Sequence, residues 1–497
     1  VIYAFVAMGI AVVWEWDLFF PDLLDLMVLG TLPVPPLRIF AARISAIAIL
    51  LLGFLVDSSV LAPVILVLST DPPGAARFFA GILLAVITSA LFAGALILAV
   101  QGVLVATLGE RMFRRFSLAV QGTAVAILVV LLLLFPMLSQ VAPTLLEAGN
   151  GYAFWFPPFW FLGIGQRVLD GPSVLPLWSH LAHTGWLALL AAWSIALFAY
   201  PTAYLRRTRQ IVVGSCARSV RLRILQPFHT LLHMTALRSP VCRAVFHFIT
   251  QTILRVPRYR INLVLYGGVG ISVVMASVLR FKIVARHFNL EYSADGIRIA
   301  IGIVAFWLIA GLRSAFVSSG NQRGSWVLTS ILGKPPVLQT ALQGLRAAQV
   351  WTVLCSSTVT LAAVALLQAI APPELRTAIA IAAQVLVACG LCLLLTEAFF
   401  LNVTSVAFTG EAPRDQGTLA FTVLRYFTFF PVVTAASLIA VHWIERGPRE
   451  FGIAALLIVV AHLWLRRQHR QHVRLYCGQI ALEEDAEDFP MKLGLRY

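Results

Sequence analysis

The chain has 497 residues, of which 60% are hydrophobic and 12% are charged, and its formal net charge is +15. A soluble domain is about half apolar and about a quarter charged, so this composition excludes an ordinary soluble protein and predicts an integral membrane protein. Long uninterrupted apolar runs predict spanning helices, not the alternating strands of a membrane barrel. Because Arg and Lys gather in the cytoplasmic loops of membrane proteins, the positive charge predicts orientation and does not point to nucleic-acid binding.

In chain order, eleven apolar segments are expected to be spans or parts of spans. The first, residues 1–13, is too short to cross about 30 Å of hydrocarbon, and we expect it to be a truncated span that lacks its N-terminal part. The complete spans are predicted at residues 44–66, 78–106, 117–140, 180–203, 261–281, 298–317, 347–370, 377–407, 418–443 and 451–465. Segments predicted on one side of the membrane carry about three times more Arg and Lys than those on the other, so that side, which includes the C-terminal tail, is expected to be cytoplasmic.

Two double prolines recur at a spacing of 300 residues: Pro35-Pro36 with Pro335-Pro336, and Pro72-Pro73 with Pro372-Pro373. A repeat of this length indicates a duplicated domain and not a solenoid array. At this offset the first span matches the seventh, and spans two to five match spans eight to eleven in the same orientation. We therefore predict an all-α polytopic membrane protein made of two parallel six-span halves. The expected divisions are a first half at 1–205, a basic connecting segment at 206–260, a second half at 261–466 and a cytoplasmic tail at 467–497.

The connecting segment contains eleven arginines and no acidic residue. From Pro240 onward its apolar residues have helical spacing, which predicts an amphipathic helix at the membrane surface with its arginines at anionic headgroups. A purely topological role for the charge is the alternative. The apolar side of this predicted helix consists of Val241, Val245, Phe246, Phe248, Ile249, Ile253 and Leu254.

A short cytoplasmic helix stopped by prolines is predicted in each half, at residues 14–43 and 314–346. Such an element can dock onto a partner, and an ordinary loop is the alternative. The residues expected to carry the docking are Leu32, Pro33, Val34, Pro35, Pro36 and Arg38 in the first half, and Trp326, Pro335 and Pro336 in the second.

The stretch TLPVPPLRIF at residues 31–40, together with six spans in each half, resembles the type-two ABC transporter permeases. In that family this stretch is the coupling region that contacts an ATPase subunit. The resemblance implies a fused permease of the exporter class in the plasma (inner) membrane, energised by a dimeric cytoplasmic P-loop ATPase that binds the ATP. The second copy is altered, with Gly333-Lys334 in place of Pro33-Val34, so the first half is expected to make the main contact.

The chain itself carries no P-loop signature and no hydrolase or zinc-protease motif, so we expect neither a bound cofactor nor an enzymatic activity. No cluster of residues with metal-ligand spacing is present, and no metal is expected. His469 and His472 are interpreted as the solvated edge of a cytoplasmic helix.

An outer aromatic segment, residues 151–166, has Trp155 and Trp160 on either side of Pro157 and Pro158. This density of aromatic rings suits the headgroup region of a membrane. The segment resembles the outer re-entrant helices between the fifth and sixth spans of type-two permeases. A structural anchor is an equally good interpretation.

Three ionisable residues, Asp57, Glu397 and Arg425, fall near or within predicted spans. An unpaired charge at mid-bilayer costs about 2.5–3.5 kcal/mol on insertion scales, so each is expected to face protein or water. The two acids are candidates for binding a cation or a proton in a transport pathway. Structural pairing, with Arg425 as a partner, is the favoured interpretation.

Two other functions stay open. A secondary transporter of parallel six-plus-six type is coupled through residues such as Asp57 or Glu397, but the charged Gly-Arg loop typical of the major-facilitator class is missing. A membrane enzyme on lipid-linked substrates needs a cluster of Asp, His or Arg at one membrane face, and none is evident. The apolar spans favour a lipid-like or amphipathic cargo, with membrane lipids as further partners.

Overall fold

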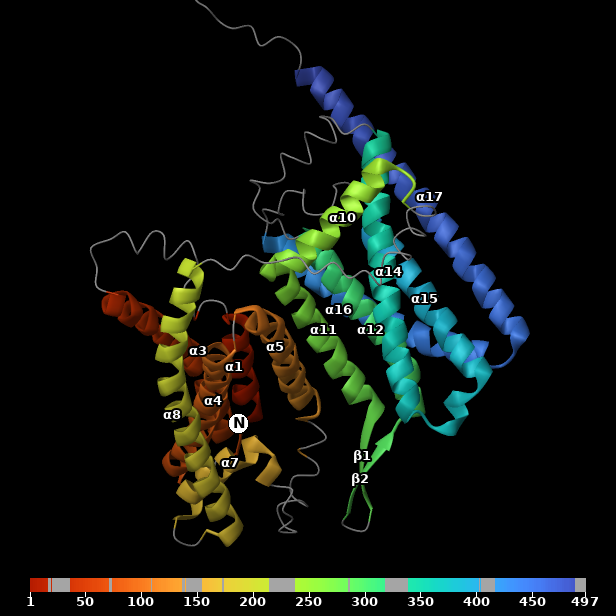
Figure 1. Cartoon of the computed structure of the whole chain (residues 1–497). Coiled ribbons are helices and arrows are strands. Elements are labelled where there is room, and N and C mark those ends of the chain that lie inside the picture. Colours follow the sequence, from red (N-terminus) through yellow and green to blue (C-terminus); the bar gives the residue numbers. More distant parts are fainter. Residues whose placement is uncertain are drawn as a thin grey trace, which may run out of the picture. The chain divides into compact units, whose positions relative to one another are not determined.

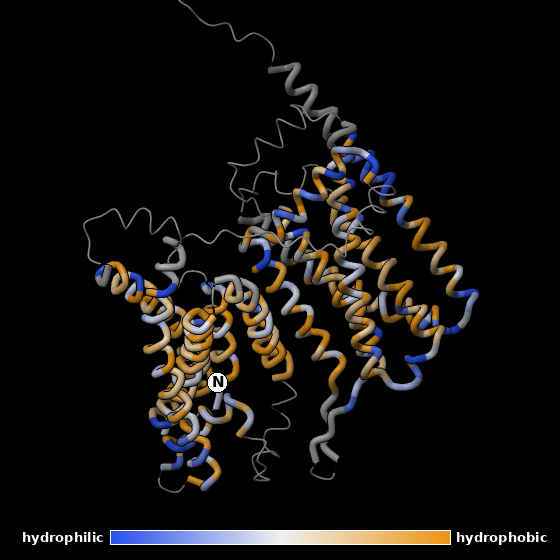
Figure 2. The backbone as a smooth tube through the Cα atoms, in the orientation of Figure 1, coloured by the Kyte–Doolittle hydropathy of each residue, from blue (hydrophilic) through white to orange (hydrophobic). Residues whose placement is uncertain are grey.

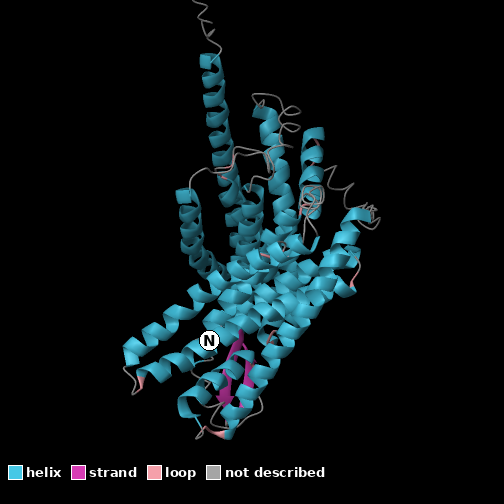
Figure 3. Cartoon of the chain, turned by 90° about the vertical axis from the view of Figure 1, so that its left-hand side faces the viewer, coloured by secondary structure: helices cyan, strands magenta, loops and turns pink. Residues whose placement is uncertain are grey.

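The protein is an almost entirely helical membrane protein. The computed structural model describes residues 1–16, 19, 36–70, 74–108, 110–135, 139, 154–171, 174–213, 237–284, 287–317, 338–401, 403 and 416–487. These residues form thirteen α-helices, a short 3-10 helix and one β-hairpin (Figures 1 and 3). Ten of the helices are long and apolar enough to cross a membrane, and each coincides with one of the ten complete spans predicted from the sequence. The prediction of an all-α multi-pass fold is thereby confirmed.

Two compact units make up the chain, one mainly of residues 1–219 and the other mainly of residues 220–497. Within each unit the helices are apolar along most of their length, and hydrophilic residues gather towards their ends (Figure 2). The first unit consists of α1 (Ile2–Trp14), α3 (Pro36–Thr70), α4 (Ala75–Thr107), α5 (Glu110–Leu133), α7 (Pro157–Asp170) and α8 (Pro176–Val213).

Helix α4 is the centre of the first unit. It contacts α1, α3, α5, α7 and α8, and more than half of its most apolar 18-residue window is buried. Small residues such as Ala85, Ala90 and Ala93 face its neighbours and let the helices approach closely. Helix α1, at the place of the predicted first fragment, is a 13-residue apolar helix that packs on α4, α3 and α5.

The second unit contains α10 (Pro240–Arg255), α11 (Pro257–Val278), α12 (Ala294–Val317), α14 (Leu338–Ile370), α15 (Ala378–Phe400), α16 (Gln416–Ile444) and α17 (Pro448–Glu487). Helix α12 lies at its centre and contacts α11, α14, α15 and α16. The ring of Phe306, on α12, is fully buried and packs against Phe399 and Phe430 with centroid separations of 5.6 and 5.3 Å. Aromatic packing thus ties α12 to both α15 and α16.

Part of the helix contact pattern agrees between the two units. The comparison takes the helices in chain order, α1, α3, α4, α5 and α8 with α12, α14, α15, α16 and α17; α17 also contacts α14 and α16, for which no equally extensive contact of α8 with α3 or α5 stands out among the described residues. Helix α1 contacts α3, α4 and α5, as α12 contacts α14, α15 and α16; α4 also contacts α3, α5 and α8, as α15 contacts α14, α16 and α17. Helix α7 has no such counterpart in the described residues.

A β-hairpin of β1 (Leu279–Val284) and β2 (His287–Tyr292) connects α11 to α12. The sequence analysis assigned no element to this outer segment. The two strands are six residues each and alternate apolar with polar residues, which is a weak signal at that length. The backbone N–H of Ser293 donates to the carbonyl of Val278 at 2.8 Å and closes the base of the hairpin.

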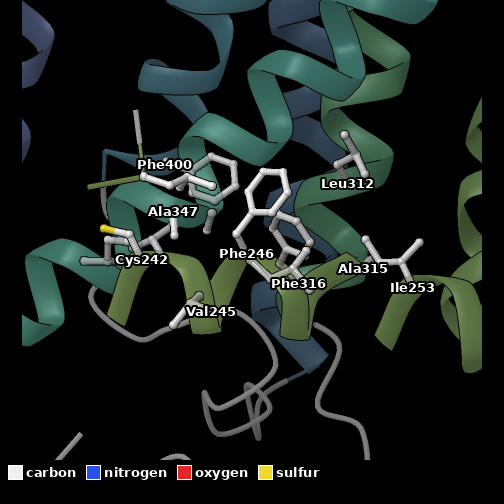
Figure 4. Close-up of a cluster of buried hydrophobic side chains, with 14 of the residues drawn as sticks. Cys242, Val245, Phe246, Ile253, Leu312, Ala315, Phe316, Ala347 and Phe400 are labelled. Carbon is white, nitrogen blue, oxygen red and sulfur yellow. The ribbon is translucent and has the colours of Figure 1, made fainter. Parts of the chain in front are cut away.

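Helix α10 is the amphipathic helix predicted in the connecting segment. It begins at Pro240, and the Ser239 side chain accepts a hydrogen bond from the backbone N–H of Cys242 at 3.1 Å. Its apolar side contacts protein instead of facing the membrane surface: Val245, Phe246 and other apolar residues are buried against α14 and α12 (Figure 4). The Trp351 indole of α14 also donates to the Thr250 hydroxyl at 2.9 Å.

Candidate functional site

The predicted coupling residues lie largely outside the described part of the chain. Leu32, Pro33, Val34 and Pro35 fall there in the first half, and Trp326, Pro335 and Pro336 fall there in the second. Helix α3 begins at Pro36, and Arg38 is exposed on its first turn. Of the candidate docking residues, Arg38 is therefore the one whose side chain the structure describes, and it is accessible.

Helix α7 forms most of the outer aromatic segment and begins at its two prolines. Pro157 and Pro158 occupy the first two helical positions. Because proline has no N–H, two of the four donors that a helix N-terminus leaves unpaired are missing here. The backbone N–H of Phe159 donates to the carbonyl of Phe156 at 3.0 Å. This helix start therefore needs few hydrogen bonds from water.

Helix α7 has the geometry of a re-entrant helix. The rings of Trp160 and Phe161 pack on Phe92, near the middle of the 33-residue α4, with centroid separations of 6.1 and 5.2 Å. At the other end of α7, the Arg77 guanidinium on the first turn of α4 donates to the carbonyl of Val168 at 2.8 Å. The 14 residues of α7 span about 21 Å, less than the roughly 30 Å of a hydrocarbon core. The helix thus runs alongside only one half of α4.

Glycines bring α7 into backbone contact with α4 on one side and α8 on the other. A Cβ added at Gly165 would lie 2.9 Å from the carbonyl oxygen of Gly81, and one at Gly163 would lie 2.8 Å from Cβ of Leu181. One at Gly185, on α8, would lie 3.0 Å from the carbonyl oxygen of Trp160. No side chain larger than hydrogen fits at these positions without a shift of a helix.

The two tryptophans of the outer aromatic segment have different surroundings. Trp155 is 86% exposed, whereas Trp160 is half-buried and its indole N–H donates to the carbonyl of Phe154 at 2.9 Å. Trp155 is therefore available to lipid headgroups, and Trp160 supports the start of α7.

Asp57 lies at the centre of an exposed apolar helix face. Helix α3 spans residues 38–70 as a membrane segment, so Asp57 is three residues from the middle, and its side chain is exposed. Its neighbours on the same face, Phe54, Leu61 and Leu68, are 41%, 63% and 79% exposed. Among the described residues no ion pair or hydrogen bond holds this carboxylate. A carboxylate in hydrocarbon is unfavourable, so this face points to water or to a polar partner.

Glu397 has the opposite environment. It is 5% exposed on α15, and its Oε1 lies 3.5 Å from Nδ1 of His462 on α17. Arg466 and Arg470 of α17 also interact with it electrostatically. The sequence analysis favoured Arg425 as a partner of these acids; Arg425 belongs to α16, and its side chain lies outside the described residues. Glu397 thus connects α15 to α17.

The sequence analysis missed a buried polar seam between α14 and α15. Thr352, Ser356 and Thr360 are fully buried on α14. The Gln368 amide donates to the side-chain carbonyl of Gln384, on α15, at 2.7 Å. The signal is the spacing of four residues between small polar side chains, which is typical of helix contacts in membranes.

The fold and these groups define a multi-pass helical membrane protein. Comparison of the chain with protein-family models, curated proteins and solved structures found no match. Within the described residues, no group of three His, Cys, Asp or Glu side chains is placed to hold a metal ion.

Proposed function

We propose that the chain is the membrane-spanning permease subunit of an ATP-driven transporter of the ABC type, built from two alike halves and energised by a separate cytoplasmic ATPase. One observation carries the proposal: within the first unit α1 contacts α3, α4 and α5 as α12 contacts α14, α15 and α16 within the second, and α4 contacts α8 as α15 contacts α17. This agreement supports a parallel duplication of one helical half, because it was expected from the double prolines alone. Membrane transporters are commonly built from such repeats.

Helix α7 supports a transport role for the first half. A simple membrane anchor does not require a short helix that starts with two prolines and packs against its neighbours through glycines. In a transporter, non-helical backbone and helix ends at membrane depth lie in protein or line a water-filled path. Under this proposal, Trp155 and the start of α7 lie near the exit of the cargo, and the export direction rests on the resemblance to exporter-class permeases.

The ATPase contact is assigned to the segment that leads into α3. Arg38 is exposed at the start of this helix, and α3 continues for 35 residues, a length of about 52 Å. A nucleotide-dependent movement of a partner at this end is carried along α3 towards the other membrane face. ATP binds more tightly to one of two states of the transporter, and this difference shifts the equilibrium between the inward-open and outward-open states.

The proposal is tested by purifying the full-length protein from its native membrane and identifying the chains that co-purify. We expect a P-loop ATPase in stoichiometric amount, with ATP hydrolysis in liposomes that depends on both proteins. Arg38→Cys should then cross-link to the ATPase, whereas Thr70→Cys, exposed at the far end of the same helix, should not. Absence of any ATPase, or equal cross-linking from both ends of α3, contradicts the proposal.

A secondary transporter is the second candidate, and the exposure of Asp57 favours it. An isolated carboxylate in an apolar span is the type of residue that binds a coupling proton or cation. The discriminating result is uptake driven by a proton gradient without an ATPase, abolished by Asp57→Asn. Under the ATP-driven proposal, Asp57→Asn leaves ATP hydrolysis intact and changes only the handling of the cargo.

A further inference from the structure

One face of α17 carries polar side chains into the second unit. His462, Arg466, His469 and Val473 follow one another at intervals of four, three and four residues, which places them on the same side of the helix. His469 is 4% exposed and Val473 is fully buried. The interpretation of His469 as a solvated edge is therefore wrong, because this side of α17 packs on α15.

Hydrogen-bonding groups on this face bind the end of α15. Nδ1 of His469 lies 3.1 Å from the carbonyl oxygen of Leu401, directly after the last residue of α15. Two turns earlier on α17, His462 pairs with Glu397. Two buried atoms, Oε2 of Glu397 and Nε2 of His469, have no hydrogen-bond partner among the described residues. Two polar atoms without a described hydrogen-bond partner thus lie on the same side of α17 as Arg466.

Helix α14 brings a further arginine to the same place. Ala347 and Ala348 of α14, Phe400 of α15 and Val473 of α17 belong to one buried apolar cluster, part of which is drawn in Figure 4. Arg346 directly precedes Ala347 and is exposed. Two helices therefore present arginines beside one cluster: α14 presents Arg346, and α17 presents Arg466 and Arg470.

No ion pair among the described residues neutralises the arginine cluster (Arg346, Arg466 and Arg470). Arg466 interacts electrostatically with Arg470, Arg346 and Glu397. In the described part of the chain no carboxylate oxygen lies within 4.0 Å of these three guanidinium groups. Neighbouring cations repel one another unless an anion joins them.

The position of the cluster along α17 indicates which anion is available. The apolar run of α17 ends at Leu465, where the last span is predicted to end, so Arg466 and Arg470 directly follow it, at the level of the headgroups. Guanidinium groups bind phosphate oxygens in a bidentate manner, and basic pockets between spanning helices bind anionic headgroups. We propose that Arg346, Arg466 and Arg470 form a binding site for the phosphate of an anionic phospholipid. This site is independent of the proposed transport function.

The experiment measures binding of phosphatidylglycerol to the purified full-length protein in neutral detergent, by native mass spectrometry. Arg466→Gln and Arg346→Gln should each weaken binding by about fivefold, the effect of one basic residue near an anionic surface. Arg467→Gln is the matched control, since it removes the same charge at the same depth from an exposed neighbouring position. Glu397→Gln should strengthen binding, because it removes the negative charge that competes for Arg466.

Three results would overturn the site. The first is an equal loss for Arg467→Gln, which indicates a general surface-charge effect. The second is displacement of the lipid by inorganic phosphate or glycerol phosphate at equal concentration, which indicates a site for a free anion. The third is unchanged binding by both Arg346→Gln and Arg466→Gln. Arg466→Lys keeps the charge but removes the bidentate guanidinium, so it should weaken binding less than Arg466→Gln does. The exposed Arg346 provides a variant that does not disturb the core.

Discussion

The docking of α7 on α8 makes Gly163→Ala the sharpest test of the first unit. An added Cβ would lie 2.8 Å from Cβ of Leu181, 2.9 Å from the backbone nitrogen of Ala182 and 3.0 Å from the carbonyl oxygen of Trp178. All three are backbone or Cβ atoms of α8. Because their positions do not depend on side-chain rotamers, no rotamer change can relieve the contact. Helix α7 must move away from α8, and its contacts with α4 must change with it.

The size of the effect follows from two opposing terms. Overpacking a close contact costs about 1–3 kcal/mol. Replacing glycine by alanine inside a helix gains about 1 kcal/mol. The expected net loss is therefore up to about 2 kcal/mol, and at this upper limit the melting temperature of a unit of about 200 residues falls by roughly 4–8 °C.

The assay combines thermal unfolding of the detergent-purified protein with hydrogen exchange of peptides that cover residues 157–170. Exchange in α7 should increase in Gly163→Ala, because the helix separates from its neighbours. Gly53→Ala on α3 is the control: no atom lies within 4 Å of its added Cβ, so it should keep or raise the melting temperature. If Gly163→Ala behaves like Gly53→Ala in both measurements, the backbone contact between α7 and α8 is refuted.

Three further outcomes are expected. Glu445→Ala removes the carboxylate that pairs with Arg298 at 2.8 Å where both side chains are mostly buried, and it should lower stability by about 1.5–3 kcal/mol, measured as a shift of the denaturant midpoint. Phe306→Ala opens a cavity at the centre of the second unit and should cost about 3–5 kcal/mol in the same measurement. In a variant freed of its six cysteines, Asp57→Cys should react with a charged thiol reagent and Leu52→Cys, on another side of α3, should not; equal reactivity contradicts a polar environment at Asp57.

The spans could be predicted because their signal is local. Each of the ten complete spans is a long apolar run, and a bilayer allows such a run one secondary structure. Helix α10 was predicted for a similar reason, since its apolar residues from Val241 to Ile253 recur with the helical period. What covers that apolar side could not be predicted, because lipid and the neighbouring α14 are equally apolar partners.

The candidate site was predictable only in part. The sequence drew attention to Pro157, Pro158 and the surrounding rings, yet the depth of α7 depends on contacts with Phe92 and Arg77, which are far away in the chain. From the sequence, Asp57 and Glu397 look alike, because each is a single acid in an apolar run. Their environments differ in the structure, since His462 lies beside Glu397 and no described residue pairs with Asp57.

Helix α3 contacts α1 and α4, as α14 contacts α12 and α15, but the two helices bury different sides. Thr352, Ser356 and Thr360 are fully buried on α14, whereas the residues 300 positions earlier, Leu52, Val56 and Val60, are 58%, 54% and 44% exposed. The position of the small residues explains why different sides are buried. On α14 they recur at every fourth position and form the seam with α15, whereas the same positions on α3 hold the large apolar residues Leu52, Val56 and Val60.

On α3 two other small polar side chains are buried, Ser58 and Ser59, which are 6% and 1% exposed. Helices in membranes associate through small residues because these permit close approach, so α3 turns Ser58 and Ser59 inward. Asp57 directly precedes Ser58, about 100° around the helix, and burying the serines places the carboxylate on the outward side. The exposure of Asp57 is thus a consequence of where Ser58 and Ser59 lie.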